Sequence, residues 1–130
     1  MSRIRLVWRY ARVDARAHPS TLFVFGDNMA RKGFGGQARE MRGEPNAVGI
    51  PTKWLPSLAA NAYFSDEDLD RVKPALDEAF GKLEAHLAAG GDVVWPDDGI
   101  GTGLAELPSR APAIRDYIAS REKRLFAMVK

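Results

Sequence analysis

Two glycine-rich segments, each directly after a short apolar run, constrain the fold of this chain most. The first runs from Gly26 to Gly36 after the apolar residues 22–25, and the second covers residues 96–103 after the apolar residues 93–95. Glycine tolerates positive φ and lets the backbone approach a ligand closely, so exposed amide groups can form an anion-binding concavity. Because open α/β sheets bind ligands at strand ends, we predict a crevice for a ligand with two phosphates.

The order of the predicted elements indicates one α/β domain over residues 1–130. Apolar alternation predicts a half-buried strand over residues 4–10, with Leu6 and Trp8 on its inward face, and continuous or short apolar runs predict the other strands. The remaining predicted strands are 21–25, 47–50 and 92–95, and the predicted helices are 36–42, 66–89 and 111–118. Pro74 is expected to kink or restart the long helix. Residues 124–129 either prolong the last helix or form an edge strand.

Composition excludes several classes of site. The chain has no cysteine and two histidines, so disulfides and thiolate metal sites are excluded, and we expect neither a metal nor a cofactor. No apolar run reaches the roughly 20 residues that span a bilayer, which favours a cytoplasmic protein. Five arginines among the first twenty residues are either the solvated side of an edge strand or a nucleic-acid face, and we favour the edge strand.

Polar side chains follow both apolar runs. Asp27 and Asn28 either form a turn or bind a ribose hydroxyl and orient a water molecule. Asp97 and Asp98 begin a loop that is expected to hold anions, so one of these carboxylates is a candidate for acid or base chemistry.

Three further side chains follow the predicted strand at 47–50. Lys53 is either an exposed loop lysine, which residue type alone favours, or a group that acts in the site. Trp54 and Tyr63 either stack on a base or fill the core, and we favour the core.

The spacing of these residues resembles that of the macrodomain family, whose members bind ADP-ribose. Asp14 stands fourteen positions before Asn28, and Gly33, Gly35 and Gly36 stand five, seven and eight positions after Asn28. The resemblance implies that Asp14 recognises the adenine end of the ligand.

The segment from Val93 to Leu104 resembles the second phosphate loop of that family. The resemblance implies a three-layer α/β/α fold with a mixed central sheet. The ligand-binding residues predicted from the loops and the resemblance are Asp14, Gly26, Asp27, Gly33, Gly35, Gly36, Gln37, Gly99, Ile100, Gly101, Thr102 and Gly103.

The pair Thr52–Lys53 and the long helix are similar to the branch that removes terminal ADP-ribose and to its ADP-ribose phosphatase-like members. In that branch a lysine attacks the anomeric carbon and an aspartate of the second loop assists. Lys53 matches the lysine, whereas Gly103 occupies the place of the aspartate, so Asp97 or Asp98 has to replace it.

The expected function is therefore binding of ADP-ribose or a related NAD-derived nucleotide, with hydrolysis of an ADP-ribosyl linkage as a further expectation. The candidate catalytic residues are Lys53, Asn28, Asp97 and Asp98. An ADP-ribosylated macromolecule is a further candidate partner. We expect no membrane partner, and nucleic acid is the less favoured partner. A non-catalytic module that binds or sequesters the nucleotide is the alternative. A Rossmann-like protein, which has a wholly parallel sheet, is a third interpretation.

Overall fold

The computed structural model describes residues 3–103 and 105–129, which form an α/β domain. The strands are β1 (Ile4–Val7), β2 (Thr21–Asn28), β3 (Ala47–Lys53) and β4 (Asp92–Pro96). The helices are α1 (Arg12–Ala17), α2 (Ala38–Met41), α3 (Leu69–Ala88), α4 (Leu107–Arg110) and α5 (Pro112–Ala127). Two 3₁₀ turns, Ala60–Ala62 and Asp66–Asp68, precede α3.

The four strands form one sheet in the order β1-β4-β2-β3, and each neighbouring pair is parallel. The predicted mixed sheet is therefore wrong for the described strands. The chain returns through a helix between successive strands, and such crossovers place the next strand in parallel. In a Rossmann half, strand 1 neighbours strand 2, whereas here β4 lies between β1 and β2.

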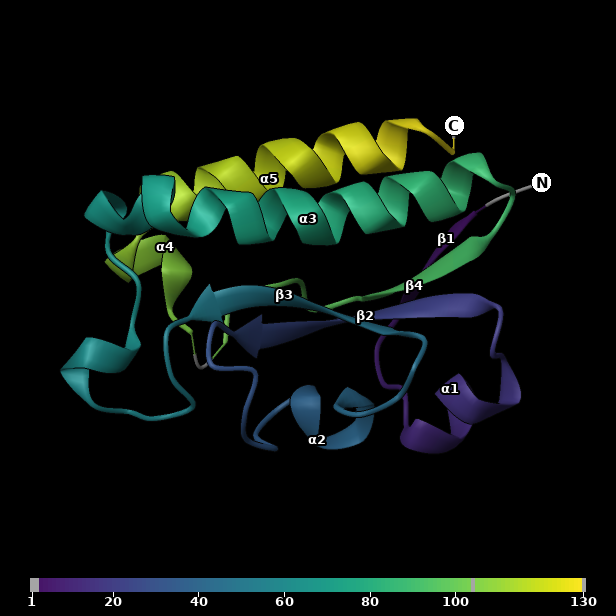
Figure 1. Cartoon of the computed structure of the whole chain (residues 1–130), viewed down its shortest axis with the longest axis horizontal. Helices are drawn as coiled ribbons and strands as arrows, with labels where there is room; N and C mark the ends of the chain where they lie inside the picture. The colour runs from purple at the N-terminus through teal and green to yellow at the C-terminus, as the bar shows by residue number, and fades with distance from the viewer. Residues whose placement is uncertain (1–2, 104, 130) are drawn as a thin grey trace.

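Helices cover both faces of the sheet (Figure 1). The long helices α3 and α5 pack on one face over the main core, whereas α1 and α2 pack on the other face over a smaller cluster. The main core includes Val24, Ile50, Leu76, Trp95 and Ile114. The smaller cluster includes Ala15, Phe25, Met41 and Val94. The domain thus has three layers, with the sheet between two layers of helices.

The first strand departs from its predicted burial. Leu6 is 57% exposed and Trp8 is 69% exposed, although alternation places both on the inward face. β1 lies at an edge of the sheet and ends at Val7, so Trp8 no longer belongs to the pleated strand. The alternation of apolar residues cannot show that the strand ends at Val7 or that it lies at the edge of the sheet.

Other element boundaries also differ from the sequence prediction. β3 continues through Pro51 to Lys53, because an edge strand tolerates a residue without an N–H. The helix α3 continues through Pro74 without restarting. The helix α5 reaches Ala127, so most of segment 124–129 is helical.

Candidate functional site

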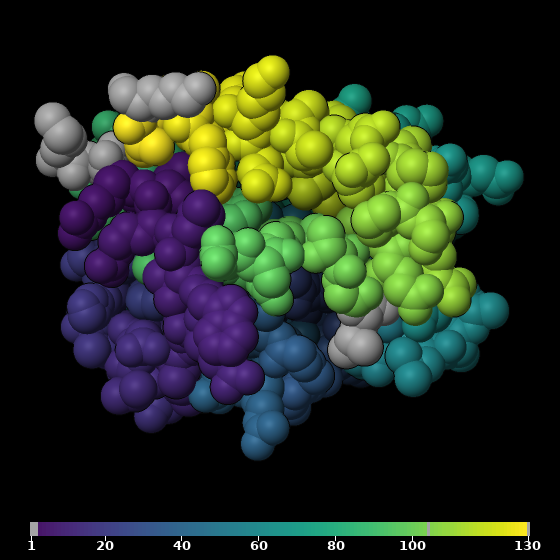
Figure 2. Space-filling model, turned by 180° about the vertical axis from the view of Figure 1, so that it is seen from behind, coloured from purple at the N-terminus to yellow at the C-terminus, as the bar shows by residue number. Residues whose placement is uncertain are grey.

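Both glycine-rich segments lie at the carboxyl ends of neighbouring parallel strands, β2 and β4. The segment after β2 leads to α2 on one face of the sheet, whereas the segment after β4 leads to α4 and α5 on the other. Loops that diverge in this way open a crevice at the strand ends. From behind, the surface is hollowed between the green second loop and the blue segment beneath it (Figure 2).

This first cavity has a volume of about 530 Å³. The sequence-predicted residues that line it are Gly26, Asp27, Asn28, Gly33, Gly35, Gly36, Gln37, Lys53, Asp98, Gly99, Gly101, Thr102 and Gly103. Residues that sequence reasoning missed also line it: Lys32, Phe34, Ala38, Arg42, Thr52, Pro56, Ser57, Leu58 and Ala105. Most of the missed residues belong to loops, where no spacing rule marks a wall of a cavity.

Three predicted site residues lie elsewhere. Asp97 is exposed and does not line the cavity, and its backbone N–H donates to the Val7 carbonyl over 3.0 Å. Ile100 is buried in the main hydrophobic core. Asp14 lines a second cavity next to the first.

Asp27 lines the first cavity, but its carboxylate is already engaged by protein groups. Its side chain is 3% exposed. One oxygen accepts from Arg42 Nη2 at 2.5 Å and from the backbone N–H of Asn28 at 2.8 Å, and the other accepts from Arg31 Nη1 at 3.0 Å. This carboxylate therefore positions two arginines rather than presenting a free acceptor to a ligand.

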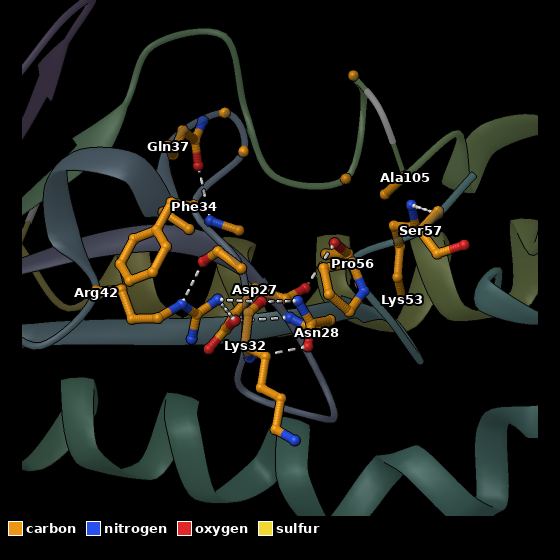
Figure 3. A pocket seen from close by; sticks show the side chains of 18 of the residues that line it. Asp27, Asn28, Lys32, Phe34, Gln37, Arg42, Lys53, Pro56, Ser57 and Ala105 are labelled. Carbon is orange, nitrogen blue, oxygen red and sulfur yellow. Dashed lines mark hydrogen bonds and ion pairs between the residues drawn. The ribbon is translucent and has the colours of Figure 1, made fainter. Parts of the chain in front are cut away.

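Arg42 and Asn28 hold the first glycine loop in place (Figure 3). Arg42 Nε donates to the Gly33 carbonyl over 2.6 Å, and its Nη2 donates to the Lys32 carbonyl over 3.0 Å. The Asn28 amide donates to the same Lys32 carbonyl over 2.8 Å and accepts from the Lys32 backbone N–H at 3.3 Å. The loop is thus preorganised before any ligand arrives.

The segment that begins at Arg42 also ties α1 to the site. Glu44 accepts from Arg12 at 2.5 Å and from Arg16 at 3.2 Å, and these two guanidinium groups hold the pKa of Glu44 below its usual range. The side-chain amide nitrogen of Asn46 lies within 3.0 Å of three backbone carbonyls, one in α1, one in the connection and one in β2, and its two N–H groups donate to them. Two of the N-terminal arginines are therefore engaged in this contact.

Gln37 connects the two glycine loops. Its carbonyl oxygen accepts from the Gly26 backbone N–H at 2.7 Å. Its amide nitrogen lies 3.3 Å from a carboxylate oxygen of Asp98 and 3.4 Å from the Gly99 carbonyl. Gln37 therefore stands at the boundary between the first cavity and the second, both of which it lines.

Lys53 lies at the end of β3, away from Gln37 in the first cavity (Figure 3). It is 9% exposed, and its Nζ donates to the Ser57 carbonyl over 2.5 Å. Burial lowers the pKa of Lys53 below its ordinary value, the nearby Arg110 adds to this effect and Glu106 opposes it. A lysine in this position has a larger neutral fraction than an exposed lysine.

The second cavity, of about 840 Å³, shares Gly36, Gln37 and Asp98 with the first. Asp14 and the exposed Trp8 line it. One carboxylate oxygen of Asp14 accepts from the Ala11 backbone N–H at 2.7 Å, which caps α1. A carboxylate has about four acceptor sites, so this bond leaves Asp14 with capacity for a ligand.

The glycines of the two loops are of two kinds. Gly33 adopts a φ of +88°, and a Cβ there would lie 2.7 Å from the Cβ of Pro56, so the fold itself requires glycine. A Cβ added at Gly35 or Gly103 would meet no atom of the described chain within 4 Å beyond the adjoining residues, and neither residue has a positive φ. At these two positions the missing side chain leaves open space along the cavity wall.

The described ranges contain no cluster of three or more His, Asp or Glu side chains that is placed to hold a metal ion. In the same part of the chain, no helix combines the length and the apolar character needed to cross a membrane. Trp54 packs against the main core and Tyr63 is buried, which agrees with the core role favoured from sequence.

Comparison with known proteins gives a family but no relative of known activity. No curated protein and no solved structure matches the chain. A family model described as "Family of unknown function (DUF7831)" matches residues 6–121. Because this match covers most of the chain, the protein belongs to the DUF7831 family of unknown function.

Proposed function

We propose that this protein binds ADP-ribose or a related NAD-derived nucleotide across the two adjoining cavities. The observation that carries the proposal is the placement of two glycine loops side by side at the ends of β2 and β4. Open space at Gly35 and Gly103 lets a diphosphate approach the backbone amides closely. Both cavity volumes fall in the range of small-molecule sites.

The charges around the first cavity support an anionic ligand. Lys32 and Lys53 line it, and the negative charge of Asp27 is offset by two arginines. Asp98, the remaining carboxylate of the lining, lies at the Gln37 boundary. The Lys53 end of the cavity is therefore suited to phosphate or to a sugar that carries phosphate.

The second cavity supports a place for the adenine. The carboxylate of Asp14 is suited to accept a hydrogen bond from the exocyclic amine of the base. The indole of Trp8 is exposed beside it and offers an apolar face for stacking. A ligand with a base at one end and a sugar at the other then crosses the boundary at Gln37.

For hydrolysis, we infer that the neutral amine of Lys53 attacks the anomeric carbon of the distal ribose. This attack breaks the ADP-ribosyl linkage, and the displaced group takes up the proton that the amine loses. Water then cleaves the lysine adduct, which releases ADP-ribose and restores the amine. Its burial and lowered pKa favour this role. Against it, Gly103 stands where the macrodomain branch that the sequence resembles has an aspartate, and Asp97 lies outside the cavity lining. Binding without turnover is therefore the second candidate function.

Titration calorimetry tests the binding proposal with ADP-ribose, NAD, AMP, ribose 5-phosphate and cyclic ADP-ribose. Gly35→Val places a side chain in the open space of the loop, and we expect it to weaken ADP-ribose binding at least tenfold, which is about 1.4 kcal/mol. Gly81→Ala is the matched control, because its Cβ also meets open space but lies in α3 away from the loops. Absence of binding to every adenine nucleotide at millimolar concentration refutes the proposal.

Asp14→Ala tests the orientation of the ligand. We expect a larger loss of affinity for ADP-ribose than for ribose 5-phosphate, because only the former carries adenine. Equal losses for the two ligands contradict the role assigned to Asp14.

Release of ADP-ribose from modified protein and nucleic acid distinguishes the two candidate functions. Wild type is compared with Lys53→Ala, Asn28→Ala and Asp98→Ala. Loss of turnover with retained binding in Lys53→Ala supports hydrolysis through this amine. Tight binding by wild type without any release favours the binding module.

A further inference from the structure

Lys53 and a second cation, Arg110, contact the same aromatic ring. Lys53 Nζ lies 4.4 Å from the centre of the Tyr63 ring, and Arg110 Cζ lies 3.6 Å from the same centre. Lys53 and Tyr63 are backbone partners in an isolated antiparallel bridge, and both are buried. The two cations therefore lie close to one ring, and the side chain of Arg110 is 41% exposed.

The position of Arg110 is fixed by the short helix that follows the second glycine loop. Arg110 Nε pairs with Glu106 at 3.2 Å, and the Arg110 backbone N–H donates to the Glu106 carbonyl over 3.0 Å. Both residues come from α4 or its N-cap, so the second loop and the Arg110–Glu106 pair belong to one continuous segment. The segment that follows the second glycine loop therefore places the charges of Arg110 and Glu106 near Lys53.

We propose that Arg110 is a positioning residue for Lys53, which it keeps reactive by stacking on the same Tyr63 ring that the amine contacts. Two cations near one ring repel each other, and the repulsion disfavours the protonated form of the buried one. A lysine amine loses its proton far more readily than a guanidinium group does, so Lys53 is the group that responds.

The direction of the Lys53 pKa shift agrees with this arrangement. Burial is the main cause of the lowered pKa of Lys53, Arg110 lowers it further, and Glu106 raises it. The other charged groups of the same cavity are Lys32, the Asp27–Arg42 pair and Asp98. Arg110 and Glu106, which lie one helical turn apart, shift the pKa of Lys53 in opposite directions. Removing their charges one at a time should therefore move this pKa in opposite directions.

The inference rests on the proposed function only in taking Lys53 as the reacting group. Its test needs no ligand. Protein labelled with ¹³C-lysine is titrated by NMR from about pH 7 to about pH 12, which brackets the ordinary lysine pKa. The chain has six lysines, and Lys53→Arg assigns the Lys53 signal. Failure here leaves the calorimetric result untouched, so the two proposals fail separately.

Arg110→Met keeps an apolar stem against Tyr63 and removes the charge. We expect the neutral fraction of Lys53 at a fixed pH to fall about threefold, because loss of the cation favours the ammonium form. Arg110→Lys retains the charge and should give a smaller change. Glu106→Gln should change the neutral fraction in the opposite direction, upwards.

Arg115→Met is the matched control, since Arg115 is an arginine at the start of α5 that pairs with Asp116. It should leave the Lys53 titration unchanged. Two results overturn the proposal: an unchanged Lys53 titration in Arg110→Met, or a shift of the same sign in Arg110→Met and Glu106→Gln. The second result indicates that α4 acts only by packing.

Discussion

The buried carboxylate of Asp27 gives the sharpest test of how the first loop is held. Asp27→Ala removes an acceptor shared by Arg42, Arg31 and the Asn28 backbone N–H. Removing one partner of a buried ion pair costs about 3–5 kcal/mol, because the other charge stays buried without compensation. Arg42 is 14% exposed and keeps its bonds to two backbone carbonyls, so we expect the lower part of that range.

The expected loss for Asp27→Ala is therefore about 3–4 kcal/mol of unfolding free energy, a large share of the roughly 5–15 kcal/mol of a typical domain. Asp27→Asn retains the shape and one acceptor, and we expect a loss of about 2 kcal/mol. Urea denaturation followed by circular dichroism measures both values. Arg31→Met is the matched control, because this arginine is 45% exposed and an exposed pair contributes no more than about 1 kcal/mol.

Double-mutant cycles separate the two arginines. The coupling of Asp27 to Arg42 should exceed its coupling to Arg31, because Arg42 is the more buried partner. A loss below about 1 kcal/mol in Asp27→Ala would falsify the assignment of Asp27 as the anchor of the loop. Equal coupling to the two arginines would show that burial does not control the strength of these pairs.

Three further predictions concern stability. Gly49→Ala should lower the unfolding free energy by about 1–3 kcal/mol in urea titration, because its Cβ would lie 2.9 Å from the Cβ of Asp27. Gly81→Ala should raise it by about 0.5–1 kcal/mol in the same assay, since this helical glycine has open space around it. The lowered pKa of Glu44 stabilises the fold above its unfolded pKa of about 4.3, and this contribution is lost as the pH falls through the folded pKa. Wild type should therefore be more stable than Glu44→Gln at neutral pH, and this advantage should shrink as the pH is lowered below the unfolded pKa of about 4.3. An advantage that grows as the solution is acidified contradicts the sign.

The sequence by itself determined the local features of the site. The apolar run before Gly26 predicts a buried strand, and it lies in β2. The apolar run before Pro96 predicts another, and it lies in β4. Glycine spacing and turn chemistry are local properties, so they place both loops at strand ends without any knowledge of the partner strands. The local pattern ends the third strand at Ile50 and places Lys53 in the following loop, whereas β3 continues to Lys53.

Only the tertiary structure decided which loops and charges meet. The insertion of β4 between β1 and β2 brings Gln37 to Asp98 and Gly99 across more than sixty residues of sequence. The pairing of Asp27 with Arg42 and the approach of Arg110 to Tyr63 likewise depend on how the layers pack. Strand order is set by how both faces of the sheet are buried against helices. A short window of sequence carries no information about that packing.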